Sequence, residues 1–286
     1  MPGSLYVVST PIGNLDDITL RALKVLKSVT TIAAEDTRRT AMLLRHFGIT
    51  TSLTSLHEHN ERRKLPVLVA ALARGDNVAL VSDAGTPVIS DPGQQLVRAA
   101  TEQGFPVVPI PGPSALLAAL AISGLPVDAF VFLGFPPTGP QRRAAWLATL
   151  AAEPRTVVFF EAPHRISRTL TDISRILVDR PISVCRELTK LHEEIIHSTT
   201  QDILAKLPKE KGEFTVVVGP QTPSETPQKD AGDQEIYNTF CQLTNSDGFS
   251  RRAAIAETAK EFGLSTKNVY AAVERWKKKG PYPFSG

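Results

Sequence analysis

Four loops, each following an expected strand, carry the small and polar side chains from which ligand sites are commonly built. They span Thr10 to Asp17, Glu35 to Arg38, Ser82 to Gly93, and Pro111 to Ala115. Glycine lets the backbone approach a ligand closely, and Asp or Ser supplies polar anchors. None of the loops holds a run of basic residues, which disfavours a multiply charged phosphate ligand. A small zwitterion or cation is the favoured class of ligand.

Several well-known catalytic and cofactor motifs are absent from the sequence. There is no G-x-x-x-x-G-K-[ST] loop, no G-x-G-x-x-G, no H-E-x-x-H and no G-x-S-x-G. Two cysteines, Cys185 and Cys241, are too few for a thiolate zinc site or a disulfide framework. His57-Glu58-His59 invites a metal interpretation, but a helix-capping role is the alternative. We predict no metal.

The elements that must position these loops alternate between strands and helices in the first half of the chain. Expected strands are Leu5–Ser9, Thr31–Ala34, Val78–Ser82 and Val107–Ile110. Expected helices between and after them include Thr37–Phe47, Asn60–Arg74, Gly93–Gln103 and Ser114–Ile122. This alternation predicts an α/β domain with a largely parallel sheet, whose ligands bind beyond the carboxyl ends of the strands.

The second half predicts another α/β domain. Expected strands are Phe130–Phe135, Thr156–Phe160, Ile182–Arg186, Glu194–His197 and Phe214–Val218, and expected helices are Gln141–Ala152, Ile166–Val178 and Gln201–Leu207. Because no helix separates Ile182–Arg186 from Glu194–His197, this sheet should be mixed. We expect an N-terminal domain over residues 1–124, a second over 125–220, a linker over 221–234 and a basic helical tail over 235–286.

The tail concentrates the positive charge of the chain. Residues 251–279 hold eight Lys or Arg and three Glu, a net charge of +5, whereas the whole chain carries +3. Ile255, Ala259 and Phe262 share one helical face, and Val269, Ala272, Val273 and Trp276 share another after Gly263-Leu264-Ser265. This is a helix-turn-helix pattern whose charge suits a polyanion, although a solvated helical face would look the same.

Nothing in the sequence predicts export or a membrane span. The N-terminus has no basic region followed by an apolar leader. The longest uncharged stretch, residues 103–127, is interrupted by Pro106, Pro109, Pro111, Pro113 and three glycines, which a spanning helix seldom tolerates. We expect a cytoplasmic protein.

Seven strings together resemble the tetrapyrrole methylase superfamily, and within it the ribosomal RNA small subunit methyltransferase I branch. They begin at Thr10, Ala34, Ser82, Ile89, Pro111, Phe160 and Glu187, and read TPIGNLDDIT, AEDTR, SDAGTP, ISDPG, PGPSA, FEAPHR and ELTK. The resemblance runs from Leu5 to about Pro220. It implies two α/β domains with a cleft between them, S-adenosylmethionine (SAM) as methyl donor, and methylation of a cytidine ribose 2′-hydroxyl near the ribosomal decoding centre. It also implies a homodimer.

The resemblance assigns cofactor contacts to positions that match its motifs. These are Pro11, Asp83, Ala84, Gly85, Thr86, Val88, Ser114 and Ala115 in the first domain, with Glu161 closing the cleft from the second. A sulfonium cation is attracted to carbonyl oxygens and a carboxylate rather than to a basic phosphate cradle. The lack of basic loops is therefore compatible with SAM.

A ribose hydroxyl loses its proton reluctantly at neutral pH, so a positioned base would help methyl transfer by roughly 10²–10⁴-fold. The candidates are Glu35 and Asp36, and Glu187 with Lys190 three residues later. An ion pair on the surface would show the same spacing, and the sequence does not choose among them.

Candidate RNA contacts are scattered along the chain. They are Arg38, His57, Arg165, Lys277, Lys278 and Lys279. His164 and Arg165 could contact phosphate or cap the next helix. Two other functions remain open at this point: methylation of a tetrapyrrole, against which the basic tail argues, and a nucleic-acid-binding ligand sensor without transfer activity.

Overall fold

A computed structural model describes residues 1–177, 179–207, 211–220, 232–245, 248–262, 264 and 266–279. The chain forms two compact units, Met1–Pro220 and Gln221–Gly286, and each is described by itself. The expected linker falls almost entirely on residues 221–231, which lie outside the described residues, as do Gly263 and Ser265 of the expected turn. In the described part of the chain, no helix combines the length and apolar character that crossing a membrane would require.

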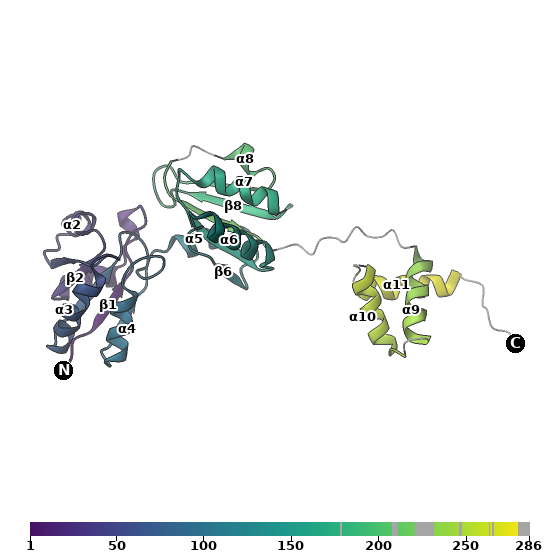
Figure 1. Ribbon diagram of the computed structural model, residues 1–286, viewed down its shortest axis with the longest axis horizontal. Helices are drawn as coiled ribbons and strands as arrows, with labels where there is room; N and C mark the ends of the chain where they lie inside the picture. The colour runs from purple at the N-terminus through teal and green to yellow at the C-terminus, as the bar shows by residue number, and fades with distance from the viewer. Residues whose placement is uncertain are drawn as a thin grey trace. The chain divides into compact units, whose positions relative to one another are not determined.

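The first sheet of Met1–Pro220 is entirely parallel, in the order β3-β2-β4-β1-β5. Figure 1 labels its strands β1 and β2. Its strands are β1 (Leu5–Val8), β2 (Thr31–Ala34), β3 (Ser52–Ser55), β4 (Val78–Val81) and β5 (Val107–Ile110). The alternation of strands and helices predicted this arrangement. β3 was not predicted, because its sequence is Ser-Leu-Thr-Ser and lacks an apolar run.

Helices cover both faces of this sheet because its strands point alternate side chains to opposite sides. After the 3₁₀ turn η1 (Leu15–Asp17), α1 (Leu20–Ser28) and α2 (Thr37–His46) pack on one face, where Ala79 and Val81 lie. The other face, with Val78 and Leu80, is covered by α3 (Glu61–Ala73) and α4 (Gln94–Glu102). The loops that follow the strands therefore meet at one edge of a rigid layer.

The second sheet is mixed, in the order β6-β7-β10-β8-β9. Its strands are β6 (Phe130–Phe132), β7 (Thr156–Glu161), β8 (Pro181–Arg186), β9 (Glu194–Thr199) and β10 (Phe214–Val218). β6 and β7 are parallel, and the other pairs are antiparallel. The direct β8–β9 pairing follows from the missing helix between them and confirms the expected mixed sheet.

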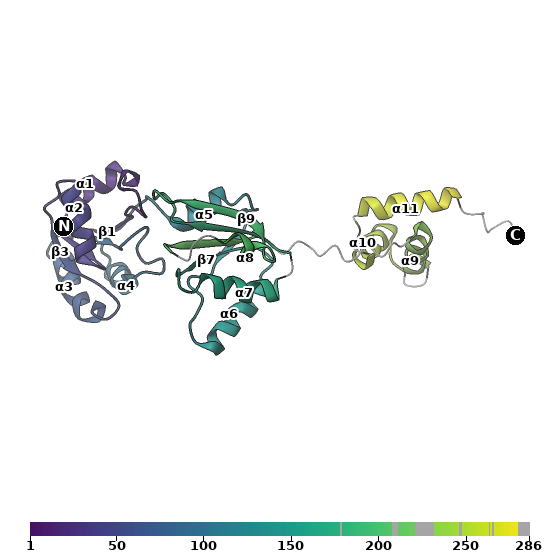
Figure 2. The ribbon, with the colours of Figure 1, turned by 90° about the horizontal axis from the view of Figure 1, so that it is seen from above.

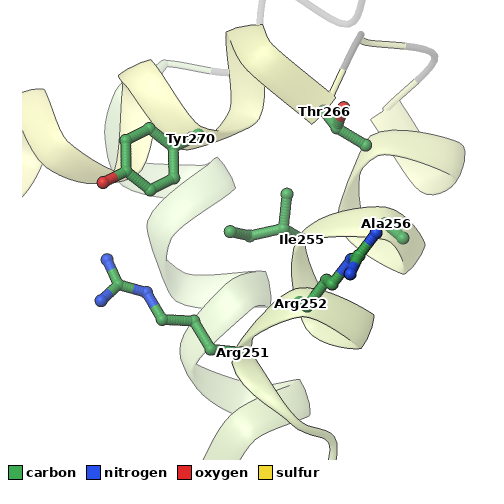
Figure 3. A pocket seen from close by; sticks show the side chains of 6 residues that line it. All are labelled: Arg251, Arg252, Ile255, Ala256, Thr266 and Tyr270. Carbon is green, nitrogen blue, oxygen red and sulfur yellow. The ribbon is translucent and has the colours of Figure 1, made fainter.

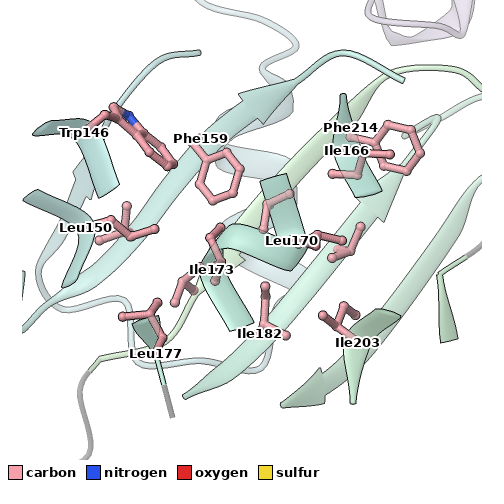
Figure 4. Close-up of a cluster of buried hydrophobic side chains, with 14 residues drawn as sticks. Trp146, Leu150, Phe159, Ile166, Leu170, Ile173, Leu177, Ile182, Ile203 and Phe214 are labelled. Carbon is pink, nitrogen blue, oxygen red and sulfur yellow. The ribbon is translucent and has the colours of Figure 1, made fainter. Parts of the chain in front are cut away.

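Helices α6 (Pro140–Ala152), α7 (Ile166–Ile176) and α8 (Ile203–Lys206) pack on one face of the second sheet. Figure 4 shows the core beneath them, with Trp146 against Phe159 and a layer of aliphatic side chains from α7. The opposite face holds α5 (Ala115–Ile122), whose Ala119 and Leu120 pack with Val158 and Val217. In Figure 2, α5 lies on the other side of the sheet from α6 and α7.

The position of α5 bears on the expected domain boundary at residue 124. The chain leaves the first sheet at β5, and α5 then contacts β7 and β10 of the second. Leu125 continues the same apolar cluster. A division by packing would therefore fall before α5, near Gly112, and the boundary at 124 stays a prediction.

The second unit contains three helices among the described residues, α9 (Asp233–Asn245), α10 (Arg251–Phe262) and α11 (Thr266–Lys279). Each packs against the other two around Ile236, Phe240, Val269 and Val273. The sequence predicted only the last two helices. Asp233 and Gln234, assigned to the linker, belong to α9, and Asp233 binds Arg275 of α11 through two hydrogen bonds of 2.7 and 2.9 Å.

Candidate functional site

Three of the predicted loops are tied together at the carboxyl edge of the first sheet. The backbone N–H of Thr10 donates to Gly85 (2.9 Å) and that of Gly85 donates back to Thr10 (3.0 Å), which forms an isolated antiparallel bridge. The hydroxyl of Thr86 lies 3.1 Å from that of Ser9 and donates to the Pro113 carbonyl at 3.5 Å. The loops after β4, β1 and β5 thus form one continuous wall.

A cavity of about 390 Å³ lies against this wall, and residues of the second sheet complete its lining. Eight of the thirteen predicted cofactor and catalytic residues line it: Glu35, Asp83, Ala84, Gly85, Thr86, Ser114, Ala115 and Glu161. Five predicted residues are not in its lining: Pro11, Asp36, Val88, Glu187 and Lys190. The cavity therefore lies beyond the carboxyl ends of the strands, where the sequence predicted a ligand site.

Sequence reasoning missed the aromatic part of the lining. Phe160 of β7 and Thr215 of β10 are register partners and face the cavity together. Phe135 packs against Phe160 with ring centroids 5.5 Å apart, whereas the Phe214 ring is buried in the core under α7 on the opposite face of the sheet. These residues read as ordinary strand positions in the sequence. Only the packing of α5 on this face of the sheet makes them part of a site.

Three carboxylates of the lining influence one another: Glu35 follows β2, and Asp83 and Asp91 lie in the loop after β4. Burial, followed by the charge of Asp83, raises the pKa of Glu35. Burial raises the pKa of Asp91 to about 6, against a hydrogen bond from Ser82, and the charges of Glu35 and Asp83 add to the rise. The region is therefore negative and holds protons more tightly than separate carboxylates would.

Asp83 connects this cluster to the start of α2. Its Oδ1 accepts the backbone N–H of Asp36 at 2.9 Å, and its Oδ2 lies 3.3 Å from the guanidinium of Arg39. Arg39 is the only Lys or Arg that lines the cavity among the residues the structure describes, and it is largely exposed. The cavity suits a cationic or zwitterionic ligand, as the loop composition predicted.

Asp36 and Arg38 have a structural role that the sequence did not reveal. The Asp36 side chain caps α2 by accepting the Arg38 backbone N–H at 2.8 Å, and the two side chains form an ion pair, also at 2.8 Å. Hydrogen bonds from Arg38 lower the pKa of Asp36 to about 2. A carboxylate of such low basicity is a poor proton acceptor near neutral pH, and Arg38 is the exposed partner of the pair.

Glu187 and Lys190 form a tight turn behind the cavity lining. Lys190 Nζ lies 2.8 Å from Glu187 and 3.1 Å from Glu213, and of these three residues Glu213 alone lines the cavity. Burial disfavours charge on both Glu187 and Lys190. Their mutual hydrogen bond, the hydrogen bonds with Glu213 and the neighbouring charges together outweigh it, so the pKa of Lys190 is raised and that of Glu187 is lowered. A Cβ on Gly13 would lie 2.3 Å from Lys190 Cγ, so glycine there lets the β1 loop rest on this turn.

Glu161 ends β7 in a network of donors. Its carboxylate accepts the Ala162 backbone N–H at 2.8 Å and a hydrogen bond from Thr169, and it lies 3.3 Å from Arg165 Nε. Arg165 also donates to the Pro136 carbonyl. The predicted RNA contact Arg165 is thus mostly buried and bridges Glu161 to the loop after β6, with a side chain 20% exposed.

The remaining predicted RNA contacts are not among the residues that line the cavity. His57 precedes α3, and its backbone N–H donates to Asn60 Oδ1 at 2.9 Å. No group of three or more metal-ligating side chains occurs in the described ranges. Lys277 lies over the Phe240 ring, 5.9 Å from its centroid. The side chains of Lys278 and Lys279 lie outside the described residues.

The second unit has a hollow of its own, of about 650 Å³, between α10 and α11. Figure 3 shows its lining: Arg251, Arg252, Ile255, Ala256, Thr266 and Tyr270. The guanidinium of Arg251 lies 5.8 Å from the Tyr270 ring centroid and pairs with Glu274 at 2.7 Å. Sequence reasoning counted these arginines in the net charge, but it did not bring them together with an aromatic ring.

Comparison with known proteins agrees with this architecture. A family model described as Tetrapyrrole (Corrin/Porphyrin) Methylases matches residues 4–204. The solved uroporphyrin-III-C-methyltransferase from Thermus thermophilus superimposes with a TM-score of 0.52 at 20% identity, over 76% of this chain and 94% of that chain. At this identity the likeness concerns the fold. The two sheets and the loops between them define a protein of the tetrapyrrole methylase class.

Curated relatives narrow the class. A protein from Synechocystis sp. is 46% identical over 94% of this chain and 96% of its own length, and one from Escherichia coli O157:H7 is 49% identical over 76% and 77%. One from Thermotoga maritima is 47% identical over 76% of this chain and 98% of its own. All three carry the name ribosomal RNA small subunit methyltransferase I. The chain belongs to this methyltransferase family.

Proposed function

We propose that the protein transfers a methyl group from SAM to the ribose 2′-hydroxyl of a cytidine in small-subunit ribosomal RNA, near the decoding centre. The observation that supports this most is the cavity, which combines the carboxylates of Glu35, Asp83 and Asp91 with aromatic side chains and is lined by residues of both halves of the unit. The names of the curated relatives support the choice of ribosomal RNA. The 2′-hydroxyl of a cytidine comes from the family resemblance.

The residues of the cavity fit SAM. Glu35, Asp83 and Asp91 offer negative charge to an ammonium or sulfonium group, and Phe135 and Phe160 offer apolar surface to a nucleoside. Ser114 caps α5, whose free N–H groups suit a carboxylate. When bound, SAM supplies an electrophilic methyl group whose departure neutralises the sulfonium charge.

The chain's own residues hold and orient the reactants. Gly85 has φ +79°, forms a backbone bridge with Thr10 and lines the cavity. Because it has no side chain, its backbone can lie directly against a ligand. Lys190 pairs with both Glu187 and Glu213 and so holds the Glu213 side chain in place. The catalytic roles that the spacing of Glu187 and Lys190 suggested stay predictions. A ligand that packs on Phe135 and Phe160 would displace water from them, which would strengthen the electrostatic interactions beside it.

We assign the RNA partner to basic residues that do not line the cavity. The hollow between α10 and α11 combines Arg251 and Arg252 with the ring of Tyr270, a combination that suits phosphate contact together with base stacking. Arg38 is 89% exposed beside the cavity loops, and His57, Arg165 and Lys277 to Lys279 stay predicted contacts. We further propose that the enzyme is a homodimer of the cytoplasm, which sedimentation of the purified protein and cell fractionation test.

One assay separates the proposed function from its alternatives. The purified protein is incubated with radiolabelled SAM and with small ribosomal subunits from cells lacking the enzyme. Label in ribosomal RNA, recovered as a 2′-O-methylated nucleoside, supports the proposal. Transfer to uroporphyrinogen but not to RNA would make the protein a tetrapyrrole methylase. SAM binding without transfer to either would make it a ligand sensor.

A further inference from the structure

The segment from Val88 to Asp91 has an unusual backbone. Val88 has φ +76° and Ser90 has φ +67°, both in the left-handed region that residues with a Cβ rarely adopt. A β-branched residue there is a particular outlier, and such residues persist only where their surroundings hold them. Backbone strain of this kind is concentrated at sites where a side chain must be presented in one orientation.

The surroundings that hold this segment come from the first sheet and its helices. Val88 packs with Leu80, Leu96 and the rest of the core under α3 and α4. Gly93 follows at φ +114°, where a Cβ would lie 2.6 Å from Leu80. The buried carboxylate of Glu61 accepts the backbone N–H of Gln95 at 3.0 Å and fixes the start of α4. The turn is therefore anchored at both ends, while Ile89, Ser90 and Asp91 line the cavity.

The charged groups around Asp91 define what its carboxylate can do. Glu35 after β2 and Asp83 after β4 face it with like charge, and Arg39 of α2 is directed to Asp83 instead. Glu161 and Glu213 are the other charged groups of the described lining. Within the described residues Asp91 forms no ion pair, and burial together with its acidic neighbours raises its pKa to about 6.

The other carboxylates are engaged elsewhere. Asp83 and Asp36 cap or anchor α2, Glu161 accepts from three donors, and Glu213 pairs with Lys190. A carboxylate held ready by a strained turn, with a basicity near neutral pH, is the one suited to take a proton. Glu35 is its nearest rival.

We propose that Asp91 is the catalytic base that accepts the proton of the ribose hydroxyl during methyl transfer. This inference rests on the proposed function. The hydroxyl oxygen forms a bond to the methyl carbon, the carbon–sulfur bond breaks with its electron pair remaining on sulfur, and the hydroxyl proton moves to the Asp91 carboxylate. A cation and a carboxylate are thereby converted into a neutral thioether and a neutral acid.

This balance of charge explains why the base lies in an acidic cavity. A bound sulfonium offsets the repulsion from Glu35 and Asp83 and keeps Asp91 ionised before transfer. Loss of that positive charge restores the repulsion, so Asp91 binds the proton more tightly as the reaction proceeds. The proton acceptor thus becomes stronger as the proton arrives, and the total charge of the cavity does not change.

The first test measures single-turnover transfer to undermethylated small subunits between pH 5 and 9, at saturating SAM and RNA. The wild-type rate should rise with pH as one group ionises and then reach a plateau. Asp91→Asn should lower the plateau at least ~10²-fold and abolish that ionisation. Glu35→Gln should move the rising limb to lower pH, because a like charge beside Asp91 is removed.

The second test does not depend on activity. Calorimetry of SAM binding at pH 6, in two buffers of different ionisation enthalpy, counts the protons released on binding. The wild-type protein should release protons as the cation lowers the pKa of Asp91, and Asp91→Asn should release fewer. Circular dichroism verifies that each variant is folded.

The outcomes separate the inference from the proposed function. A wild-type protein that transfers no methyl group to RNA overturns the proposed function and the inference with it. An Asp91→Asn variant with the wild-type rate, pH profile and proton release overturns the inference alone. Loss of the ionisation in Glu35→Gln, with only a shift in Asp91→Asn, assigns the base to Glu35 and also overturns the inference.

Discussion

Asp91 should make the protein less stable as the pH rises. Its pKa is about 6 in the folded protein, against 3.8 for an unperturbed Asp side chain. Between these values the unfolded chain has lost the proton that the folded protein still binds, so the free energy of unfolding falls with pH. The difference corresponds to at most about 3 kcal/mol, at 1.36 kcal/mol per pKa unit.

Asp91→Asn removes this ionisation and should therefore stabilise the protein at pH 7. We expect a gain of about 1 to 3 kcal/mol in the free energy of unfolding, since Asp91 is half-buried and partly solvated. At pH 3.5 the gain should vanish, because Asp91 is then largely protonated in both states. Urea unfolding of the full chain, followed by circular dichroism at pH 3.5, 5 and 7, measures it.

Asp128→Asn is the matched control, because Asp128 is exposed and its substitution should change stability by less than about 0.5 kcal/mol at every pH. An Asp91→Asn variant that is less stable than wild type at pH 7, or whose gain does not grow with pH, would refute the reasoning. It would mean that the carboxylate is stabilised as an anion, which also disqualifies it as a base near neutral pH.

Three further substitutions test other parts of the site and the tail. Gly85→Val should lower SAM affinity, measured by calorimetry, at least tenfold, while the protein still folds. A Cβ at this position would only touch Ile12 at 3.4 Å, so there is space for it. A β-branched residue at φ +79° nevertheless costs about 1–2 kcal/mol, which should move the loop. Gly85→Ala should have a smaller effect, and wild-type affinity in the valine variant contradicts the placement. Lys190→Met leaves Glu187 and Glu213 without their cation and should lower the free energy of unfolding, measured with urea, by about 1 kcal/mol. The single-turnover rate should stay within tenfold of wild type. A ~10²-fold loss of that rate would instead give Lys190 a catalytic role. The double variant Arg251→Gln, Arg252→Gln should bind the small ribosomal subunit more weakly, with unchanged SAM affinity. The slope of log affinity against log salt concentration should become shallower by about one unit per lost phosphate contact. An unaltered slope would mean that the hollow does not contact RNA.

The cavity loops could be predicted because their position follows from the parallel sheet alone. Asp83 to Thr86 follow β4 and Ser114 follows β5, and the ends of parallel strands meet at one edge. The aromatic walls could not be predicted in this way. Phe160 and Thr215 join the site only because α5 crosses from the first sheet to the second, a step that no local pattern indicates.

The roles of individual carboxylates depend on partners that are distant in sequence. Asp36 and Asp91 are both aspartates in loops that follow strands of the first sheet. Arg38 nevertheless lowers the pKa of Asp36 to about 2, whereas burial raises the pKa of Asp91 to about 6. Spacing also favoured Glu187 and Lys190, which prove to face Glu213 from behind the lining. Helix α9 was missed because its apolar residues follow a polar stretch that reads as linker.

The central claim is that this cavity directs a methyl group to one ribose of small-subunit RNA. Its most direct test maps 2′-O-methylation at nucleotide resolution in small-subunit RNA from cells that lack the protein, and from the same cells supplied with wild type or Asp91→Asn. The account predicts that one cytidine near the decoding centre is unmethylated without the protein, is restored by wild type and is not restored by the variant. An unchanged methylation map in cells that lack the protein would contradict it.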